Sequence, residues 1–98
     1  MYAKLLRFDV GFGRPQSAEQ IAAETRKTMS RHPGFASMEL LADYLGGRYT
    51  LIAYWHTERD YYNFSYSPDA RELEGAVGRL MTGVPFTGFY QVYQPAQG

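Results

Sequence analysis

The residues best suited to chemistry in this sequence are its aromatic side chains. They make up 16% of the 98 residues and comprise nine tyrosines, six phenylalanines and one tryptophan. Tyrosine combines a large apolar ring with a hydroxyl that needs a partner when it is buried, so it suits the walls of a ligand pocket or an interface. The alternative is that the tyrosines belong to an ordinary strand-rich fold, and composition alone leaves both interpretations open.

Other reaction chemistries find little support. The absence of cysteine excludes disulfides, thiol catalysis and thiolate metal ligands. The two histidines, His32 and His56, lack the H-x-x-x-H or H-x-x-E-H spacing of a metal site. Gly11-Phe12-Gly13 is not followed by the glycine and helix register of a phosphate-binding loop. We therefore expect neither a metal nor an organic cofactor.

Charge and hydropathy also limit the partners. Ten acidic and ten basic side chains give a net charge of zero, whereas nucleic-acid binding needs an uncompensated basic patch. No apolar run could span a bilayer, and Met1 leads into an expected strand without a signal peptide. The sequence thus predicts a cytoplasmic protein that binds neither nucleic acid nor membranes.

The stretch from Leu40 to Ser67 predicts a β-hairpin followed by a capped helix. Gly46-Gly47 fits a two-residue hairpin loop, which would pair residues whose numbers add to 93. Thr57 and Asp60 have the spacing of a helix cap, and the helix is expected over about 58–66. One face of this hairpin would collect Met38, Leu40, Ala42, Tyr44, Tyr49, Leu51, Ala53 and Trp55.

The remaining elements follow from periodicity and caps. Alternating residues predict a first strand over Tyr2–Gly11, and a capping box at Ser17 predicts the start of the first helix. Ser67 followed by proline predicts the start of a third helix. In this helix we expect Gly75 and Gly78 to mark close backbone packing, and a hinge over a pocket is the alternative. The last strand is expected over 86–94, with the residues after it as a tail.

This order is β-α-β-β-α-β with the second helix split in two, which predicts a single α+β domain over 1–98 (95–98 being the tail) with a ferredoxin-like fold. Its helices would cover one face of a four-stranded antiparallel sheet. The other face is too apolar for solvent and too charged for a dry core, so we expect a homodimer through it. The alternative is a monomer with a wet second face. That face would carry Leu5, Arg7, Asp9, Glu39, Leu41, Asp43, Ile52 and Tyr54.

Three short motifs resemble the antibiotic biosynthesis monooxygenase (ABM) family. They are the Pro33-Gly34-Phe35 turn, the hairpin end Tyr54-Trp55 and the capped helix start over 57–61. The resemblance implies a dimeric α+β barrel with a pocket in each subunit between sheet and helices. Some members of this family oxidise polycyclic phenols or quinols with molecular oxygen and no cofactor, and others degrade haem.

The haem-degrading branch has an asparagine on the first strand, a tryptophan in the helix after the third strand, and a histidine about ten residues further on. Counting from Trp55 places Phe64 at the tryptophan and Glu74 at the histidine, and Leu5–Val10 contains no asparagine. Since all three positions differ, we do not expect haem degradation.

The resemblance implies a cofactor-independent monooxygenase acting on a small aromatic or polycyclic phenol or quinol. Two alternatives stay open, a non-catalytic dimeric barrel that binds an apolar small molecule, and a structural dimer with a filled core. Whether the protein is an enzyme, and through which catalytic residues, is not assigned from the sequence. The candidate pocket residues are Tyr44, Tyr49, Trp55, Tyr61, Tyr62, Asn63 and Phe64.

Overall fold

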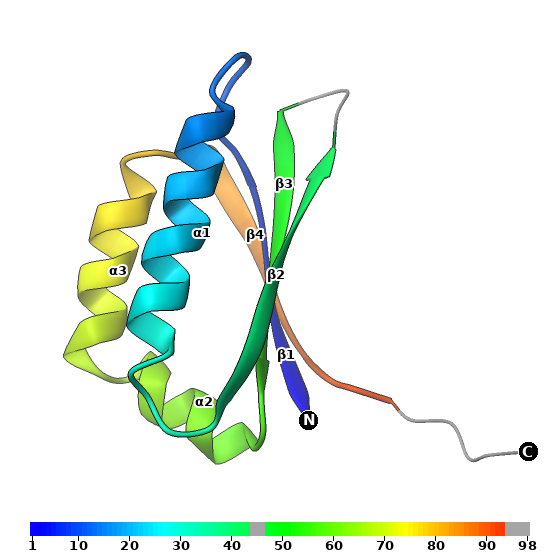
Figure 1. Cartoon of the computed structure of the whole chain (residues 1–98), viewed down its shortest axis with the longest axis vertical. Helices are drawn as coiled ribbons and strands as arrows, with labels where there is room; N and C mark the ends of the chain where they lie inside the picture. Colours follow the sequence, from blue (N-terminus) through cyan, green and yellow to red (C-terminus); the bar gives the residue numbers. More distant parts are fainter. Residues whose placement is uncertain (44–46, 94–98) are drawn as a thin grey trace, which may run out of the picture.

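The computed structural model describes residues 1–43 and 47–93, in which three helices cover one face of a four-stranded antiparallel sheet (Figure 1). The strand order is β2-β3-β1-β4. The expected ferredoxin-like α+β arrangement, with its second helix divided, is thereby confirmed. The elements are β1 (Tyr2–Asp9), α1 (Pro15–Met29), β2 (Phe35–Asp43), β3 (Arg48–Trp55), α2 (Glu58–Ser65), α3 (Pro68–Gly78) and β4 (Thr82–Gln91).

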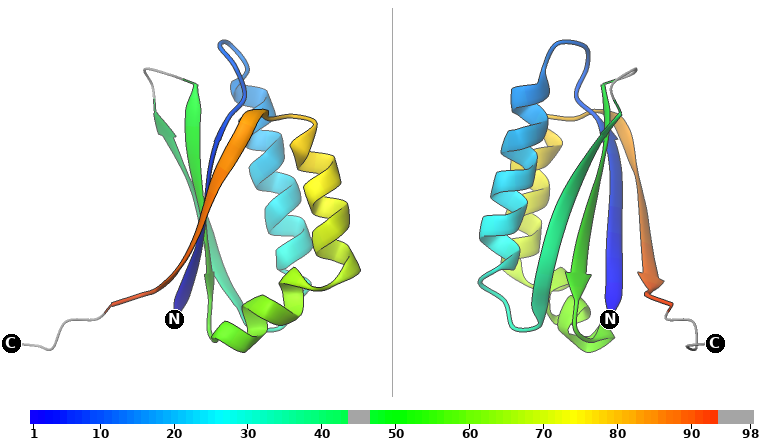
Figure 2. Two further views of the ribbon diagram at one scale, coloured as in Figure 1. Left: turned by 180° about the vertical axis from the view of Figure 1, so that it is seen from behind. Right: turned by 45° about the vertical axis from the view of Figure 1, so that its right-hand side comes forward.

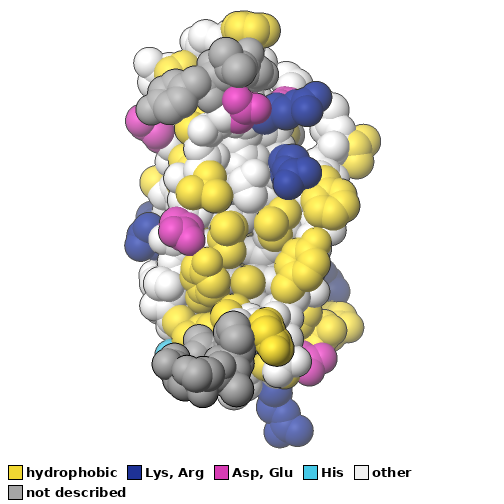
Figure 3. Space-filling view, turned by 90° about the vertical axis from the view of Figure 1, so that its right-hand side faces the viewer, with side chains coloured by type: hydrophobic (Ala, Val, Ile, Leu, Met, Phe, Trp, Pro, Cys, Tyr) yellow, Lys and Arg dark blue, Asp and Glu magenta, His cyan; other side chains and the backbone are white. Residues whose placement is uncertain are grey.

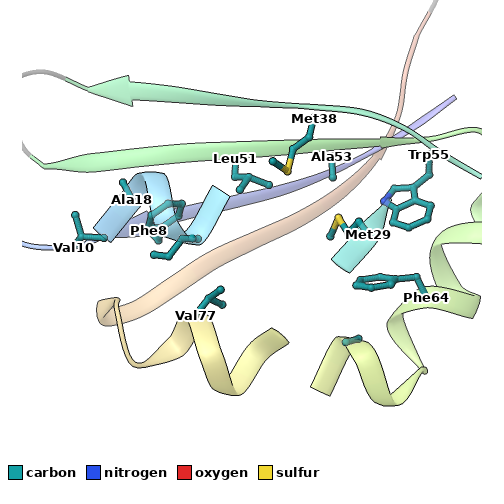
Figure 4. Packing of buried hydrophobic residues seen from close by; sticks show 12 residues of the cluster. Phe8, Val10, Ala18, Met29, Met38, Leu51, Ala53, Trp55, Phe64 and Val77 are labelled. Carbon is teal, nitrogen blue, oxygen red and sulfur yellow. The ribbon is translucent and has the colours of Figure 1, made fainter. Parts of the chain in front are cut away.

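The helices form a single layer over the sheet. Helices α1 and α3 lie side by side, and the short α2 lies near the end of the sheet where β1 begins (Figure 2). None of the described helices is both long and apolar enough to cross a membrane. The core between the layers contains Phe8, Val10, Ala18, Ile21, Met29, Met38, Leu51, Ala53, Trp55, Phe64, Ala70 and Val77 (Figure 4).

The hairpin register differs from the sequence prediction. Asp43 pairs with Arg48 and Leu40 pairs with Leu51, so paired numbers add to 91 and the prediction of 93 is wrong. A shift by two residues keeps every side chain on its own face, so the predicted buried face is retained. Gly47 has a φ of 68°, and a Cβ there would lie 3.2 Å from the Gly11 carbonyl oxygen. A close approach of two loops therefore explains this glycine.

Several element boundaries also differ from the prediction. Strand β1 ends at Asp9 instead of Gly11, and β4 ends at Gln91 instead of residue 94. Helix α1 begins at Pro15, and Ser17 lies inside it; Arg14 occupies the cap position without a side-chain hydrogen bond. Proline suits the first helical turn because its missing N–H would have no partner there. Strand β4 begins at Thr82 instead of residue 86, because an irregularity in its pairing with β1 accommodates the extra residues.

The predicted caps of the two later helices are confirmed. The Thr57 hydroxyl accepts a hydrogen bond from the Asp60 backbone N–H at 3.0 Å, and the Ser67 hydroxyl accepts one from the Ala70 N–H at 3.3 Å. Each bond satisfies a backbone donor that has no partner within its helix. The two caps start α2 and α3 in quick succession and so fold this segment over the sheet.

None of the described helices or strands covers the sheet face opposite the helices, which we call the open face. Its exposed apolar side chains gather in one area, with charged side chains around them (Figure 3). Tyr54 donates a hydrogen bond to Glu39 at 3.1 Å, and this bond raises the pKa of the Tyr54 hydroxyl above its ordinary value of 10.0. The Arg7 guanidinium lies 5.7 Å from the centre of the Phe86 ring. The open face thus combines the apolar and charged groups expected from the sequence.

Candidate functional site

A cavity of about 260 Å³ lies between the sheet and the helices, and we call it the helix-side cavity. Strands β1, β3 and β4 form its floor, and all three helices contribute to its walls. Aromatic, aliphatic and polar side chains share the lining. The lining residues are Lys4, Leu6, Thr25, Met29, Leu51, Ala53, Tyr61, Phe64, Ser65, Ala70, Leu73, Glu74 and Thr87.

Small side chains leave the space open at its centre. Ala53 lies on the floor and Ala70 on the α3 wall, and both are buried. Helix α2 has three cavity-lining residues, Tyr61, Phe64 and Ser65, which fall on one side of the helix because they are three or four positions apart. The Thr57 cap fixes where this helix begins and therefore which of its residues face inward.

Trp55 anchors the aromatic end of the cavity without lining it. Its side chain is fully buried, and its ring stacks on Phe64 with centroids 5.4 Å apart and an interplanar angle of 26°. The rings of Tyr61 and Phe35 contact the Trp55 ring edge-on, with centroid distances of 6.0 Å and 5.6 Å respectively. Its indole N–H has no hydrogen-bond partner among the described residues. Trp55 therefore holds the two aromatic residues that face the cavity.

Two charged side chains of opposite sign line the cavity. Lys4 projects from β1, and its ammonium lies 5.5 Å from the centre of the Tyr61 ring. Glu74 projects from α3 and is exposed. The hydroxyl of Thr25, a third polar group, donates to the Ile21 carbonyl at 2.7 Å. The cavity thus offers charged groups at its margin and an aromatic wall.

A polar cluster ties the helices together beside the cavity. His32 Nε2 hydrogen-bonds Asp69 Oδ2 at 2.8 Å, and Arg31 lies 3.5 Å from the same oxygen. The His32 bond, followed by the Arg31 charge, outweighs partial desolvation and lowers the pKa of Asp69 below its ordinary value of 3.8. The His32 ring also meets Phe64 edge-on, with centroids 5.0 Å apart. The cluster therefore joins the end of α1 to the start of α3.

The candidate residues from the sequence are divided among several places. Tyr61 and Phe64 line the helix-side cavity, and Trp55 lies behind them. Tyr62 is exposed and contacts Phe89, and Asn63 is exposed and lines none of the described hollows. Tyr49 lies apart from this cavity and lines a hollow near the hairpin end, whereas Tyr44 falls outside the described residues.

Lys4 and Glu74 were not among the candidate pocket residues, although the sequence contains a feature that points to each of them. Lys4, Leu6 and Phe8 are spaced two residues apart on β1, so their side chains lie on the same face of the strand. This spacing alone places Lys4 on the helix-covered face. Glu74 and Phe64 were reached by counting from Trp55, and both line the cavity. A lysine in a strand pattern is easily assigned to solvent, and this one instead faces the helices.

Other hollows fit a small aromatic ligand less well. The hollow at the hairpin end is about 450 Å³, and it adjoins residues outside the described part of the chain. A groove of about 200 Å³ between α1 and α3 is lined mostly by charged side chains. Among the described residues, no group of three or more His, Cys, Asp or Glu side chains could hold a metal ion.

Comparisons with known proteins identify other proteins that have the same fold. No family model and no curated protein sequence matches the chain. Solved structures do match. SnoaB, a cofactor-independent oxygenase from Streptomyces nogalater, solved as a variant with an asparagine replaced by alanine, has a TM-score of 0.83 at 24% identity. That match covers 99% of this chain and 97% of SnoaB.

Two further structures have the same fold. A monooxygenase from the gene ActVA-Orf6 of Streptomyces coelicolor, solved with the ligand nanaomycin D, has a TM-score of 0.79 at 23% identity and matches over 99% of this chain and 91% of its own. Rv0793 from Mycobacterium tuberculosis has a TM-score of 0.70 at 19% identity, with 98% of each chain covered. The resemblance to the ABM family is confirmed at the level of the fold, and fold alone does not fix activity.

Proposed function

We propose that this protein is a monooxygenase of the ABM type that oxidises a small phenol or quinol in the helix-side cavity without metal or flavin. The observation that carries the proposal is the cavity itself, whose aromatic wall of Tyr61 and Phe64 is held by the buried Trp55. The description of SnoaB as a cofactor-independent oxygenase supports the reaction class.

The volume of the cavity limits the substrate. Sites for drug-sized ligands span roughly 300–1,000 Å³, and this cavity, at about 260 Å³, lies just below that range. One or two fused rings are therefore a better match than a larger polycycle. Naphthols and naphthohydroquinones are the natural first substrates to test.

The reaction needs no external reductant. A phenol such as 1-naphthol reacts with one O₂ to give a quinone and one water. One oxygen atom becomes the new carbonyl oxygen, and the other leaves as water with the hydrogens lost from the ring carbon and the hydroxyl. The substrate supplies all four electrons. The protein's part is to exclude water, orient the ring and stabilise the anion that reacts with oxygen.

Oxygen uptake tests the proposal. 1-Naphthol should give one equivalent of 1,4-naphthoquinone and one water per O₂. 1,4-Naphthohydroquinone should give 2-hydroxy-1,4-naphthoquinone and water, whereas 1,4-naphthoquinone with hydrogen peroxide would indicate dehydrogenation without oxygen insertion. Ala53→Leu should abolish the uptake because the larger side chain fills the floor of the cavity. Ala42→Leu is the matched control, since Ala42 lies on the same sheet face but lines the hairpin-end hollow. No uptake above the uncatalysed rate for any phenol would disprove the activity.

The second candidate is a non-catalytic protein that binds an apolar small molecule. One observation favours it: neither histidine lines the cavity, so the usual general base at neutral pH is missing there. Calorimetric titration beside the oxygen measurement separates the two. A binder retains saturable binding that Ala53→Leu removes, with no oxygen consumed. Replacing Trp55 by phenylalanine should lower affinity modestly in a binder, and turnover as well in an oxygenase.

We also propose that two copies pair through the open face. Leu41, Phe86 and Tyr90 on this face are each about half exposed, at 49%, 53% and 50%. Exposed apolar side chains gathered on one face of a protein are typical of protein–protein interfaces. Arg7 and Glu39 lie among these residues and give the pairing a polar component. Cytoplasmic location remains a prediction from the sequence.

A further inference from the structure

Lys4 occupies an unusual position for a lysine. Strand β1 places it on the same face as Leu6 and Phe8, and its strand neighbours are Ala53 on β3 and Phe89 on β4. The side chain is half-buried between the sheet and the helices, where it lines the helix-side cavity. A lysine in such a layer is uncommon, because burial disfavours the charged form unless an anion compensates.

No such anion is present within the described part of the chain. The ion pairs there join Arg31 and His32 to Asp69, and Arg48 to Asp9. Among the described residues, Lys4 takes part in none of these ion pairs and makes no hydrogen bond, and its one specific contact there is with the Tyr61 ring. The other charged group of the cavity, Glu74, is exposed on α3 and forms no ion pair with Lys4 within 4.0 Å. The ammonium therefore has unused hydrogen-bond donors inside a ligand-sized space.

From this arrangement we propose that Lys4 binds an anionic oxygen substituent on an aromatic ligand in the helix-side cavity. An ammonium has three donors, and hydrogen bonds to an ionised oxygen are roughly twice as strong as those between neutral groups. The ring would lie against Tyr61 and Phe64, with the oxygen directed toward β1. The inference thus deepens the proposed function, because it assigns the ionised form of a phenol as the bound species.

The chemical consequence concerns the proton of the substrate. A positive charge beside a phenol lowers the phenol pKa because it favours the charged form. Lys4 would therefore hold the substrate as the phenolate, the electron-rich species that reacts with oxygen. Lys4 acts here as a substrate-binding residue, and it is not assigned a proton-transfer role.

A competing explanation is that Lys4 only packs on the Tyr61 ring through a cation–π contact. The two explanations differ in what the ligand must carry. If Lys4 only supports Tyr61, its removal weakens charged and neutral ligands alike. If Lys4 binds the ligand oxygen, its removal weakens only the charged ligand.

The test compares 2-naphthoate with 2-naphthamide, which have the same ring system and differ in charge. Binding is followed by calorimetry and by the indole N–H signal in NMR spectra, which is unique because Trp55 is the single tryptophan. We expect Lys4→Met to lower the affinity for 2-naphthoate by about tenfold or more relative to the affinity for 2-naphthamide. Lys4→Arg should retain the preference for naphthoate, and Glu74→Gln should strengthen it by removing a like charge.

Lys27→Met is the matched control, because Lys27 is the only other lysine and lies on the exposed side of α1. It should leave the binding of both probes unchanged. An unaltered ratio of the two affinities in Lys4→Met would overturn the proposal, as would absence of naphthoate binding to the unaltered protein at millimolar concentration. Neither measurement involves oxygen, so the binding role can succeed or fail independently of the proposed oxygenase activity.

Discussion

At the scale of single residues, Trp55 carries two opposing contributions. Its ring is buried against Phe35, Tyr61 and Phe64, which stabilises the fold. Its indole N–H has no partner among the described residues, and a buried unsatisfied donor costs about 1–3 kcal/mol. The aromatic packing must therefore outweigh this cost.

We expect Trp55→Phe to lower the free energy of unfolding by less than about 2 kcal/mol, because the loss of ring volume is partly offset by removal of the unpaired N–H. Trp55→Ala should cost about 3–5 kcal/mol, since it leaves a large cavity. Urea unfolding followed by circular dichroism measures both values. Equal losses in the two variants would contradict this account of Trp55.

Asp69 gives the second prediction at this scale, a pH dependence of stability. Its pKa is lower in the folded protein, so its ionised form stabilises the fold above the ordinary value of 3.8. This contribution is lost as the pH falls through the lowered pKa. Asp69→Asn should therefore reduce the urea midpoint at pH 7, and this reduction should shrink progressively as the pH falls below 3.8.

Glu72→Gln is the control for that experiment, because Glu72 lies on the same helix and makes no ion pair or hydrogen bond among the described residues. It should not reproduce the pH-dependent difference. If Asp69→Asn had the same effect above and below pH 3.8, the loss would come from packing and not from the charge of Asp69.

At the scale of the elements, substitution of two different glycines by alanine is expected to have opposite effects on the free energy of unfolding. A Cβ at Gly75 or Gly78 on α3 would meet no atom within 4 Å, so the close packing expected from the sequence is wrong. Gly34 has a φ of 87°, and a Cβ there would collide with the Asp60 side chain, which also contacts the Thr57 cap.

We therefore expect Gly75→Ala to raise the free energy of unfolding by about 0.5–1 kcal/mol, because alanine restricts the unfolded chain and favours the helix. Gly34→Ala should lower it by more than about 1 kcal/mol, because the left-handed backbone and the collision both oppose a side chain. Thermal unfolding of both variants checks this pair. Stabilisation by Gly34→Ala would show that the turn after α1 can move aside.

The elements were predictable where local chemistry determines them. Thr57 and Ser67 are caps with defined spacing, and both start helices as predicted. The hairpin register was missed because slips by two residues bury the same side chains, so hydrophobic pattern cannot distinguish them. The start of α1 was missed because Pro15 and Ser17 both favour a helix start, and proline at the first helical position prevailed.

The site was less predictable than the elements, because a cavity depends on how whole layers fit together. Tyr61 and Phe64, which were among the candidate pocket residues, both line the helix-side cavity. Tyr62 and Asn63, their neighbours on α2, are exposed because the helix turns them outward. Lys4 was not among the candidates, although its spacing of two residues from Leu6 on β1 places both side chains on the helix-covered face.

At the scale of the whole molecule, the open face distinguishes a paired barrel from a monomer. Ile52 lies at its centre, opposite Leu5 of β1 and Glu39 of β2. Burial of this face between two copies would desolvate a carboxylate placed at position 52 beside the carboxylate of its strand neighbour Glu39, which is strongly unfavourable. In a monomer the same carboxylate would remain in water at little cost.

We therefore expect Ile52→Glu to convert a dimer of the unaltered protein into a folded monomer, as measured by light scattering and circular dichroism. Ala23→Glu is the control, because it adds the same carboxylate on an exposed position of α1, away from the sheet, and should leave the dimer intact. The helix-side cavity lies on the other side of the sheet. If each subunit forms its site alone, the monomeric variant should therefore still bind 2-naphthoate.

A monomeric unaltered protein would disprove the pairing. A dimeric Ile52→Glu variant would place the interface elsewhere, and loss of binding on dissociation would mean that pairing shapes the cavity through the sheet.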